Sequence, residues 1–196
     1  FRRAETWKGN GDIDPVRGTD GPLSVSPTRL KRSITEKWLD AAENAGYKRN
    51  PDYNGIDQEG VGYFQLTLDK GRRCSSAVAY LNPARKRKNL TVITHAQAEK
   101  VLIKKSRAFG VTINRKGQSH DILARREVIL SAGTIGSPQI LMLSGIGAAT
   151  ELKKHGINMI KDLPGVGKNL QDHLQARPVF KTNLSTINTE INNVFK

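Results

Sequence analysis

Residues 126–147, which read REVILSAGTIGSPQILMLSGIG, decide the fold of this 196-residue chain. The apolar run at residues 128–130 predicts a buried strand, and the Ser-Pro pair at residues 137–138 opens an apolar helix that SGIG ends. Between them Ala132 and Gly133 have almost no side chain. A ligand could therefore approach the backbone there, as at strand ends in open α/β sheets. The residues alone leave open the alternative that both are small for packing.

The most regular helical pattern lies between the Ser-Pro pair at residues 26–27 and Gly46, which suit the two ends of a helix. Its apolar residues recur every three or four positions, so they form one stripe. The pattern therefore predicts one helix with its apolar stripe in the core, and this stripe comprises Leu30, Ile34, Trp38, Ala41 and Ala45.

Residues 90–94, 98–103 and 108–113 are short strand candidates, and the turn between the last two is Lys-Lys-Ser-Arg. Short strands joined by tight polar turns predict an antiparallel meander that leads to the strand at 128–130. We also expect strands at 22–25, 61–68 and 178–181, and helices at 75–81 and 148–155. The fold class is therefore mixed α and β.

Composition excludes several classes of protein. No apolar run approaches the length of a membrane span, and Cys74 is a single cysteine, which excludes an intrachain disulfide and a thiol-rich metal site. No histidine has metal-ligand spacing, so no metal is expected. The ends of the chain do not give its location, and we expect it in the cytoplasm or at the periphery of the inner membrane.

The net charge of +14 is unevenly spread, since residues 70–126 hold fifteen Lys or Arg and only Glu99 and Asp121 as acidic residues. Such a segment could bind nucleic acid, a membrane surface or a phosphorylated cofactor. The alternative is a solvated face, which is the usual state of a charged run. No aromatic residues are interleaved with the run Arg-Lys-Arg-Lys at 85–88, so we expect no nucleic-acid partner.

The stretch SAGTIGSPQILMLSGIG resembles the second signature of the glucose–methanol–choline oxidoreductases, a family of FAD-dependent alcohol oxidases and dehydrogenases. Residues 163–173, LPGVGKNLQDH, are similar to the segment that follows it in that family. The resemblance is closest to the bacterial choline dehydrogenase branch. It extends to FRRAE at 1–5, DGPLSV at 20–25, GRRCSSAVAYL at 71–81 and NLTVITHA at 89–96.

The resemblance implies FAD as cofactor and a small-molecule alcohol as substrate, oxidised by hydride transfer to the flavin. It implies that the meander covers the adenine end of FAD, with Ala98 in contact through its backbone. Ala132 and Gly133 would face the cofactor, and Asp172 and His173 would lie in a flavin-side loop.

The implied fold is part of an FAD-binding α/β domain with its meander, plus part of an antiparallel-sheet substrate domain. Residues 1–70 would belong mainly to the substrate domain, residues 71–175 mainly to the FAD-binding domain, and residues 176–196 again to the substrate domain.

Two parts of the expected chemistry are missing from the sequence. No G-x-G-x-x-G fingerprint is present, and the loop at residues 163–169 lacks the residues of a phosphate-binding P-loop. In the family, the fingerprint and the catalytic His lie outside the region that this chain matches. His173 is a less favoured candidate for the general base that removes the alcohol proton. We therefore expect an internal segment that is catalytically inactive alone and binds FAD weakly or not at all.

Overall fold

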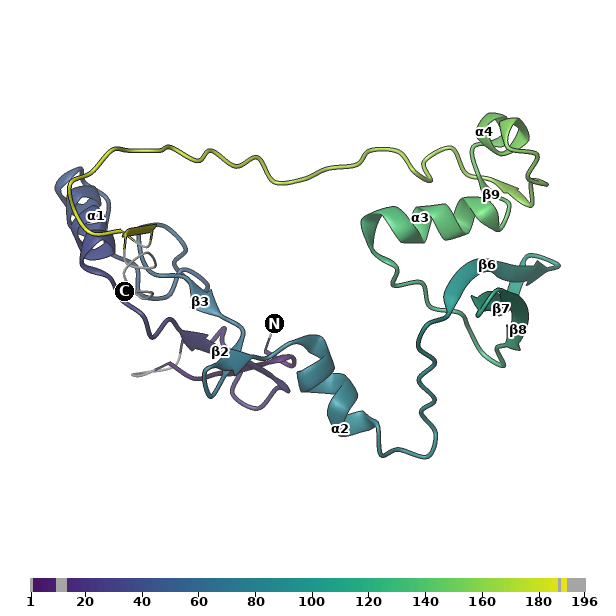
Figure 1. The fold of residues 1–196 in the computed structure, drawn as a ribbon, viewed down its shortest axis with the longest axis horizontal. Helices are drawn as coiled ribbons and strands as arrows, with labels where there is room; N and C mark the ends of the chain where they lie inside the picture. The colour runs from purple at the N-terminus through teal and green to yellow at the C-terminus, as the bar shows by residue number, and fades with distance from the viewer. Residues whose placement is uncertain (1, 10–13, 187, 190–196) are drawn as a thin grey trace. The chain divides into compact units, whose positions relative to one another are not determined.

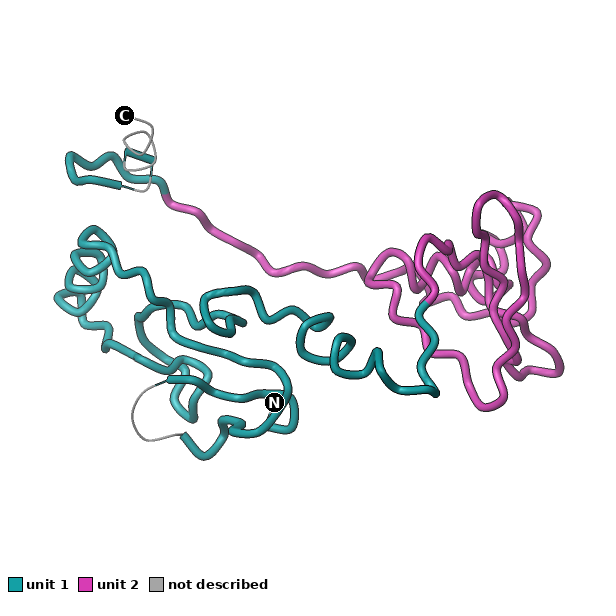
Figure 2. Tube along the Cα trace, turned by 60° about the horizontal axis from the view of Figure 1, so that its bottom comes forward, with its two compact units in different colours: residues 1–92, 179–196 teal, residues 93–178 magenta. Residues whose placement is uncertain are grey.

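The computed structural model describes residues 2–9, 14–186 and 188–189, and it divides the chain into two compact units (Figure 2). The first unit comprises Phe1–Val92 with Val179–Lys196, and the second comprises Ile93–Pro178. Each contains helices and strands, which confirms the mixed α and β class (Figure 1). The division into domains at residues 70 and 175 concerns the family's architecture and stays a prediction.

Three short strands organise the first unit. β1 (Glu5–Trp7) runs parallel to β2 (Leu23–Pro27), and β2 pairs antiparallel with β3 (Gln65–Leu66). The strand predicted at 22–25 is therefore confirmed, whereas the one predicted at 61–68 is broken into shorter pieces. A hairpin and a helical turn follow, and they comprise β4 (Leu68–Asp69), β5 (Arg72–Arg73), η1 (Ala77–Leu81) and α2 (Asn82–Ala84).

The predicted long helix is present as α1 (Ser33–Asn44), and Gly46 follows it with a φ of +97°, as expected of a C-terminal cap. Its predicted start and its predicted core are wrong. Residue Pro27 pairs with Gln65 in the sheet, so the helix begins later. Trp38 is 56% exposed and Leu39 only 2% exposed, because the helix meets the unit along the side that carries Leu39.

The second unit contains the meander, in which β6 (Gln97–Lys104), β7 (Arg107–Arg115) and β8 (Gln118–Leu123) pair antiparallel. The strands predicted at 98–103 and 108–113 are confirmed. The strand predicted at 90–94 is wrong: that run has no strand partner in the described structure, and the third strand instead follows the turn at Gly117. The hairpin between β6 and β7 turns on Lys105 and Ser106, both left-handed, as a two-residue hairpin turn requires.

The signature helix is α3 (Gly133–Leu143), so its predicted start at the Ser-Pro pair is wrong: Pro138 lies inside the helix. It is followed by β9 (Ile146–Gly147), α4 (Ala149–Lys154) and β10 (Lys161–Asp162), which pairs parallel with β9. The strand predicted at 128–130 is wrong, because no described strand pairs with these residues. The helix predicted at 148–155 is confirmed as α4, whose Leu152 is fully buried.

Residues 178–181 form no strand and are exposed, which corrects the prediction there. None of the described helices is long and apolar enough to cross a membrane.

Candidate functional site

The start of α3 presents open backbone at the two small residues. Gly133 has a φ of +79°, a conformation that favours glycine, and Ala132 donates its N–H to Oγ of Ser137 at 3.0 Å. Both small residues are exposed. A Cβ added at Gly133 would meet no atom within 4 Å beyond its chain neighbours and its own helix backbone. Packing within the described residues therefore does not account for this glycine.

The other end of α3 is joined to the meander by Ser144. Its Oγ accepts the backbone N–H of Val101 in β6 at 2.7 Å and donates to the carbonyl of Ile140 at 2.5 Å. Ser144 and Val101 are both buried. A hydroxyl can accept and donate at once, so this serine satisfies a strand group and a helix group that water does not reach.

The glycines after Ser144 allow the chain to return closely. Gly145 has a φ of +83°, and a Cβ there would lie 2.4 Å from the carbonyl oxygen of Asn158. Gly147 pairs with Asp162 in the parallel β9–β10 ladder, and Asp162 also accepts the N–H of Ala149 at 3.0 Å, at the start of α4. The SGIG motif is therefore where α3, the meander and the β9–β10 pair meet.

Ala98 lies near the start of β6, half-buried and paired with Ile113. A register shift follows it at Glu99, so the strand departs from regular pairing next to Ala98. β6 and α3 are in contact and start on the same side of the second unit in Figure 1. The structure thus brings the elements that carry Ala98 and Gly133 together, and it joins them through Ser144.

Asp172 and His173 lie in a segment without helix or strand, and both are exposed. Oδ1 of Asp172 accepts the backbone N–H of His173 at 2.8 Å, so this contact does not orient the imidazole. Within the described part of the chain, no hydrogen bond connects either residue to Ala98, Ala132 or Gly133. Their role in a flavin-side loop stays a prediction.

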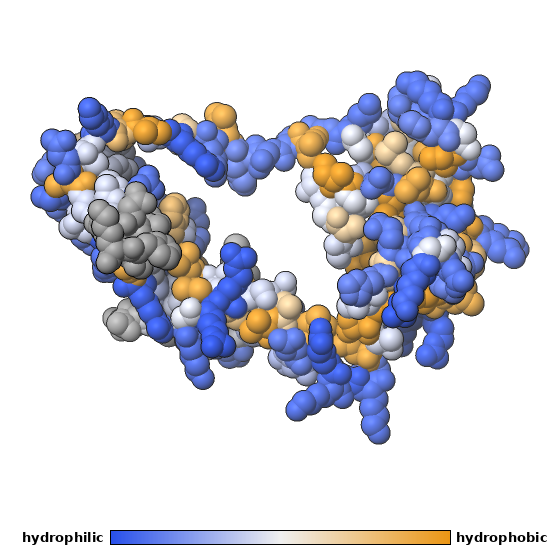
Figure 3. Space-filling view, viewed as in Figure 1, coloured by the Kyte–Doolittle hydropathy of each residue, from blue (hydrophilic) through white to orange (hydrophobic). Residues whose placement is uncertain are grey.

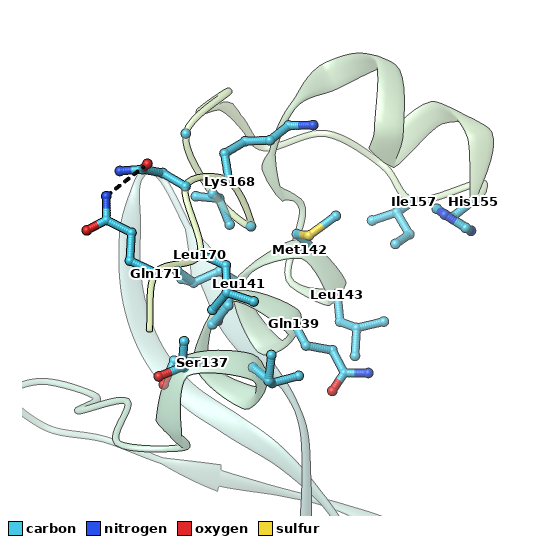
Figure 4. A pocket seen from close by; sticks show the side chains of 17 residues that line it. Ser137, Gln139, Leu141, Met142, Leu143, His155, Ile157, Lys168, Leu170 and Gln171 are labelled. Carbon is cyan, nitrogen blue, oxygen red and sulfur yellow. Dashed lines mark hydrogen bonds between the residues drawn. The ribbon is translucent and has the colours of Figure 1, made fainter. Parts of the chain in front are cut away.

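An open pocket of about 840 Å³ lies along the flank of α3 (Figure 4). Its walls are mostly apolar side chains of α3, such as Leu141 and Met142, and the loop at residues 165–171. Gly167 of that loop would place a Cβ 3.4 Å from Sδ of Met142, so the loop that resembles a P-loop packs on the helix. Lys168 and His155 are the titratable residues of the lining.

The described residues offer binding surface rather than reacting groups. No three of their His, Cys, Asp or Glu residues lie close enough to hold a metal ion. No acidic residue lines the pocket beside α3, and Glu151, which interacts electrostatically with Lys168 and His155, lies outside the lining. Hydrophobic side chains are widely visible on the surface of the second unit (Figure 3). The arrangement can therefore hold an extended ligand against backbone, and among the described residues no side-chain hydrogen bond orients the ring of His155 or His173.

The basic segment at residues 70–126 is divided between the two units at residue 92. In the meander, its two acidic side chains are used within the sheet. Glu99 accepts hydrogen bonds from Asn114 and Ser119, and Asp121 accepts one from Thr112. The absence of a nucleic-acid partner stays an expectation.

Comparison with known proteins decides the family, since the GMC oxidoreductase family model matches residues 2–175. The chain belongs to this family. The oxygen-dependent choline dehydrogenase of Photobacterium profundum is 48% identical over 177 residues, which cover 89% of this chain and 31% of that protein. The human mitochondrial choline dehydrogenase is 49% identical over 159 residues, which cover 81% of this chain and 27% of that protein. The predicted likeness to choline dehydrogenases is confirmed.

Solved structures of oxidoreductases have a fold similar to that of this chain. Pyridoxine 4-oxidase from Mesorbium loti superposes with a TM-score of 0.81 at 30% identity, over 88% of this chain and 34% of that one. An FAD-dependent oxidoreductase from Chaetomium thermophilum gives 0.79 at 28% identity, over 87% and 32%. This GMC oxidoreductase chain spans about 30% of the length of the curated relatives it matches.

Sequence reasoning selected Ala132 and Gly133 but placed them at the end of a strand and not at the start of α3. It missed Ser144, which was assigned only to ending the helix. Its partner Val101 lies 43 positions away, so no local pattern reveals the contact. The third meander strand was also missed, although the Gly117 turn followed by the apolar pair Ile122 and Leu123 could have indicated it.

Proposed function

We propose that the full-length protein carrying this chain is an FAD-dependent oxidoreductase that acts on CH–OH groups, and that residues 1–196 supply one wall of its FAD site. The observation that carries this proposal is the open backbone at Gly133, which leaves room for a close ligand approach at the position where the family resemblance expects the cofactor. Family membership and the FAD-dependent oxidoreductase among the structural neighbours support the cofactor.

The residues present fit a dinucleotide that lies along backbone. Ala98 would meet the adenine side from β6, and Ala132 and Gly133 would meet the cofactor from the start of α3. A bound FAD would supply the hydride acceptor for the alcohol carbon, and the chain's residues would hold it. The chain's own contribution is to hold and align FAD.

Proton removal from the alcohol falls outside what these residues supply. His173 is exposed, and the contact that Asp172 makes is with its backbone rather than its ring. A general base must lie within hydrogen-bond reach of the proton and needs a neighbour that orients it. We therefore assign the base to another part of the full-length protein and expect residues 1–196 alone to be inactive.

Choline is the first alcohol to test, because the curated relatives named above are choline dehydrogenases. Two aromatic faces of the described residues are already covered by cations of the chain itself. Arg17 forms a cation–π contact with the ring of Trp7, and Lys31 forms one with the ring of Tyr63.

The experiment is to purify the full-length protein and, separately, residues 1–196. We expect the former to contain FAD and to reduce a dye when choline or another alcohol is added. We expect the latter to show neither property. A full-length protein that lacks flavin, cannot be reconstituted with FAD and reduces no dye with any alcohol would contradict the proposal.

A further inference from the structure

We propose that Ser144 is a positioning residue for FAD, because its hydroxyl joins the two elements whose backbone is assigned to the cofactor. This inference rests on the proposed function. The Oγ of Ser144 binds the N–H of Val101 in β6 and the carbonyl of Ile140 in α3. It is therefore the direct polar link between the helix that begins at Gly133 and the strand that carries Ala98.

The link lies between the two assigned contacts. α3 has 11 residues, so Gly133 lies about 15 Å from the Ser144 end of the helix. Ala98 lies three positions before Val101, about 10 Å along β6. The helix is regular over this length, and the strand stays paired with β7 on both sides of the register shift at Glu99. An alignment set at Ser144 is therefore carried to Gly133 by the helix and to Ala98 by the strand.

Burial makes the hydroxyl hard to replace. The N–H of Val101 donates to Oγ of Ser144, and both residues are almost inaccessible to water. In Ser144→Ala this N–H would be left without a partner. A buried donor without a partner drives a local rearrangement that brings it to water or to another acceptor. Because β6 supplies this donor, the rearrangement would move β6 relative to α3.

A ligand that contacts both elements gains affinity from their prior alignment, whereas a ligand that contacts one element does not. FAD would contact both, and AMP would contact only the β6 side. Loss of the Ser144 hydroxyl should therefore weaken FAD much more than AMP. A general loss of folding would weaken both ligands alike.

The test uses the full-length protein after removal of its flavin. Dissociation constants for FAD and AMP are measured for wild type, Ser144→Ala and Ser144→Cys. Cysteine keeps a weak acceptor of similar shape and guards against a variant that fails to fold. Thr112→Val is the matched control: it removes a buried hydroxyl that bonds Asp121 in the same meander, and it leaves the link to α3 intact.

We expect Ser144→Ala to weaken FAD by about tenfold and AMP by less than about twofold, with Ser144→Cys between wild type and Ala and Thr112→Val near wild type. Unchanged FAD affinity in the Ser144 variants would overturn the inference. Equal weakening of FAD and AMP, or a similar FAD loss in Thr112→Val, would also overturn it. A wild-type protein that binds no FAD would overturn the proposed function itself.

Discussion

The guanidinium of Arg17 and the carboxylate of Glu5 form a buried ion pair, with Nη1 2.9 Å from Oε1 and side-chain exposures of 4% and 6%. The same guanidinium lies over the ring of Trp7, 4.1 Å from its centroid, and donates to Gln65 at 3.1 Å. The second oxygen of Glu5 accepts the N–H of Gly18 at 3.1 Å. The interior of the first unit is therefore organised around a charge pair at this point.

Replacing one member of this pair should be costly. Arg17→Met leaves the Glu5 carboxylate buried without its counter-charge, and we expect the free energy of unfolding to fall by about 3–5 kcal/mol. Urea denaturation measures the change. The double variant Arg17→Met/Glu5→Gln should be more stable than the single variant, since the fully buried carboxylate is removed and only the partly exposed Asp52 loses its contact with Arg17. A single variant as stable as wild type would show that the pair contributes little.

Acid should weaken the attachment of α1. Hydrogen bonds from Arg49 first, and then Tyr63, hold the pKa of Glu36 below its ordinary value. A group with a lowered folded-state pKa stabilises the fold above its ordinary pKa, about 4.3, and this stabilisation is lost as the pH falls through the folded value. Glu36→Gln should therefore reduce stability at neutral pH and make the remaining stability less sensitive to pH in the acid range.

Thermal unfolding between pH 7 and pH 3 measures this difference. Glu127→Gln is a suitable control, because Glu127 makes no ion pair among the described residues. Added salt should narrow the difference between wild type and Glu36→Gln, since the bridge to Arg49 is partly exposed. Parallel pH curves for wild type and Glu36→Gln would argue against the bridge.

Gly133 and Gly117 form a matched pair for testing the cofactor wall. Their φ values are +79° and +80°, and neither has an atom within 4 Å of an added Cβ beyond its own local chain. Alanine at either position should cost about 1–2 kcal/mol of stability, because a left-handed conformation is forced on it. We expect only Gly133→Ala in the full-length protein to weaken FAD, measured by flavin titration. Equal FAD affinities of Gly133→Ala and Gly117→Ala would show that Gly133 does not contact FAD.

Gly145 should tolerate substitution far less well than Gly156. Both have positive φ, but a Cβ at Gly145 would lie 2.4 Å from a backbone oxygen, and one at Gly156 would meet nothing within 4 Å. Gly145→Ala should therefore cost about 3 kcal/mol or more, and Gly156→Ala about 1 kcal/mol. Urea unfolding followed by circular dichroism would compare them. Similar losses would show that the chain near Asn158 can move aside.

Local patterns predicted the features that depend on neighbouring residues. The end of α1 at Gly46 follows from a left-handed conformation that glycine adopts readily, and the hairpin between β6 and β7 follows from two apolar runs joined by a short polar turn. These are properties of a few consecutive positions, so the sequence is enough to predict them.

The failures involve partners far along the chain. An apolar run such as residues 128–130 becomes a strand only when another strand supplies its hydrogen bonds, and none of the described strands does so. Trp38 fits the apolar stripe of α1, but burial depends on which side of the helix meets the rest of the unit. The Ser144–Val101 bond connects two elements whose contact no periodicity reveals.

The meander has two different edges. Along β6, Oγ of Ser144 accepts the N–H of Val101, and α3 lies against the strand. β8 pairs only with β7 among the described residues, and all six of its residues are exposed, Leu123 at 71%. An additional strand would therefore join the sheet beside β8. In residues 1–196 alone, the same edge is a template for pairing between molecules, so self-association by strand addition is expected to begin there.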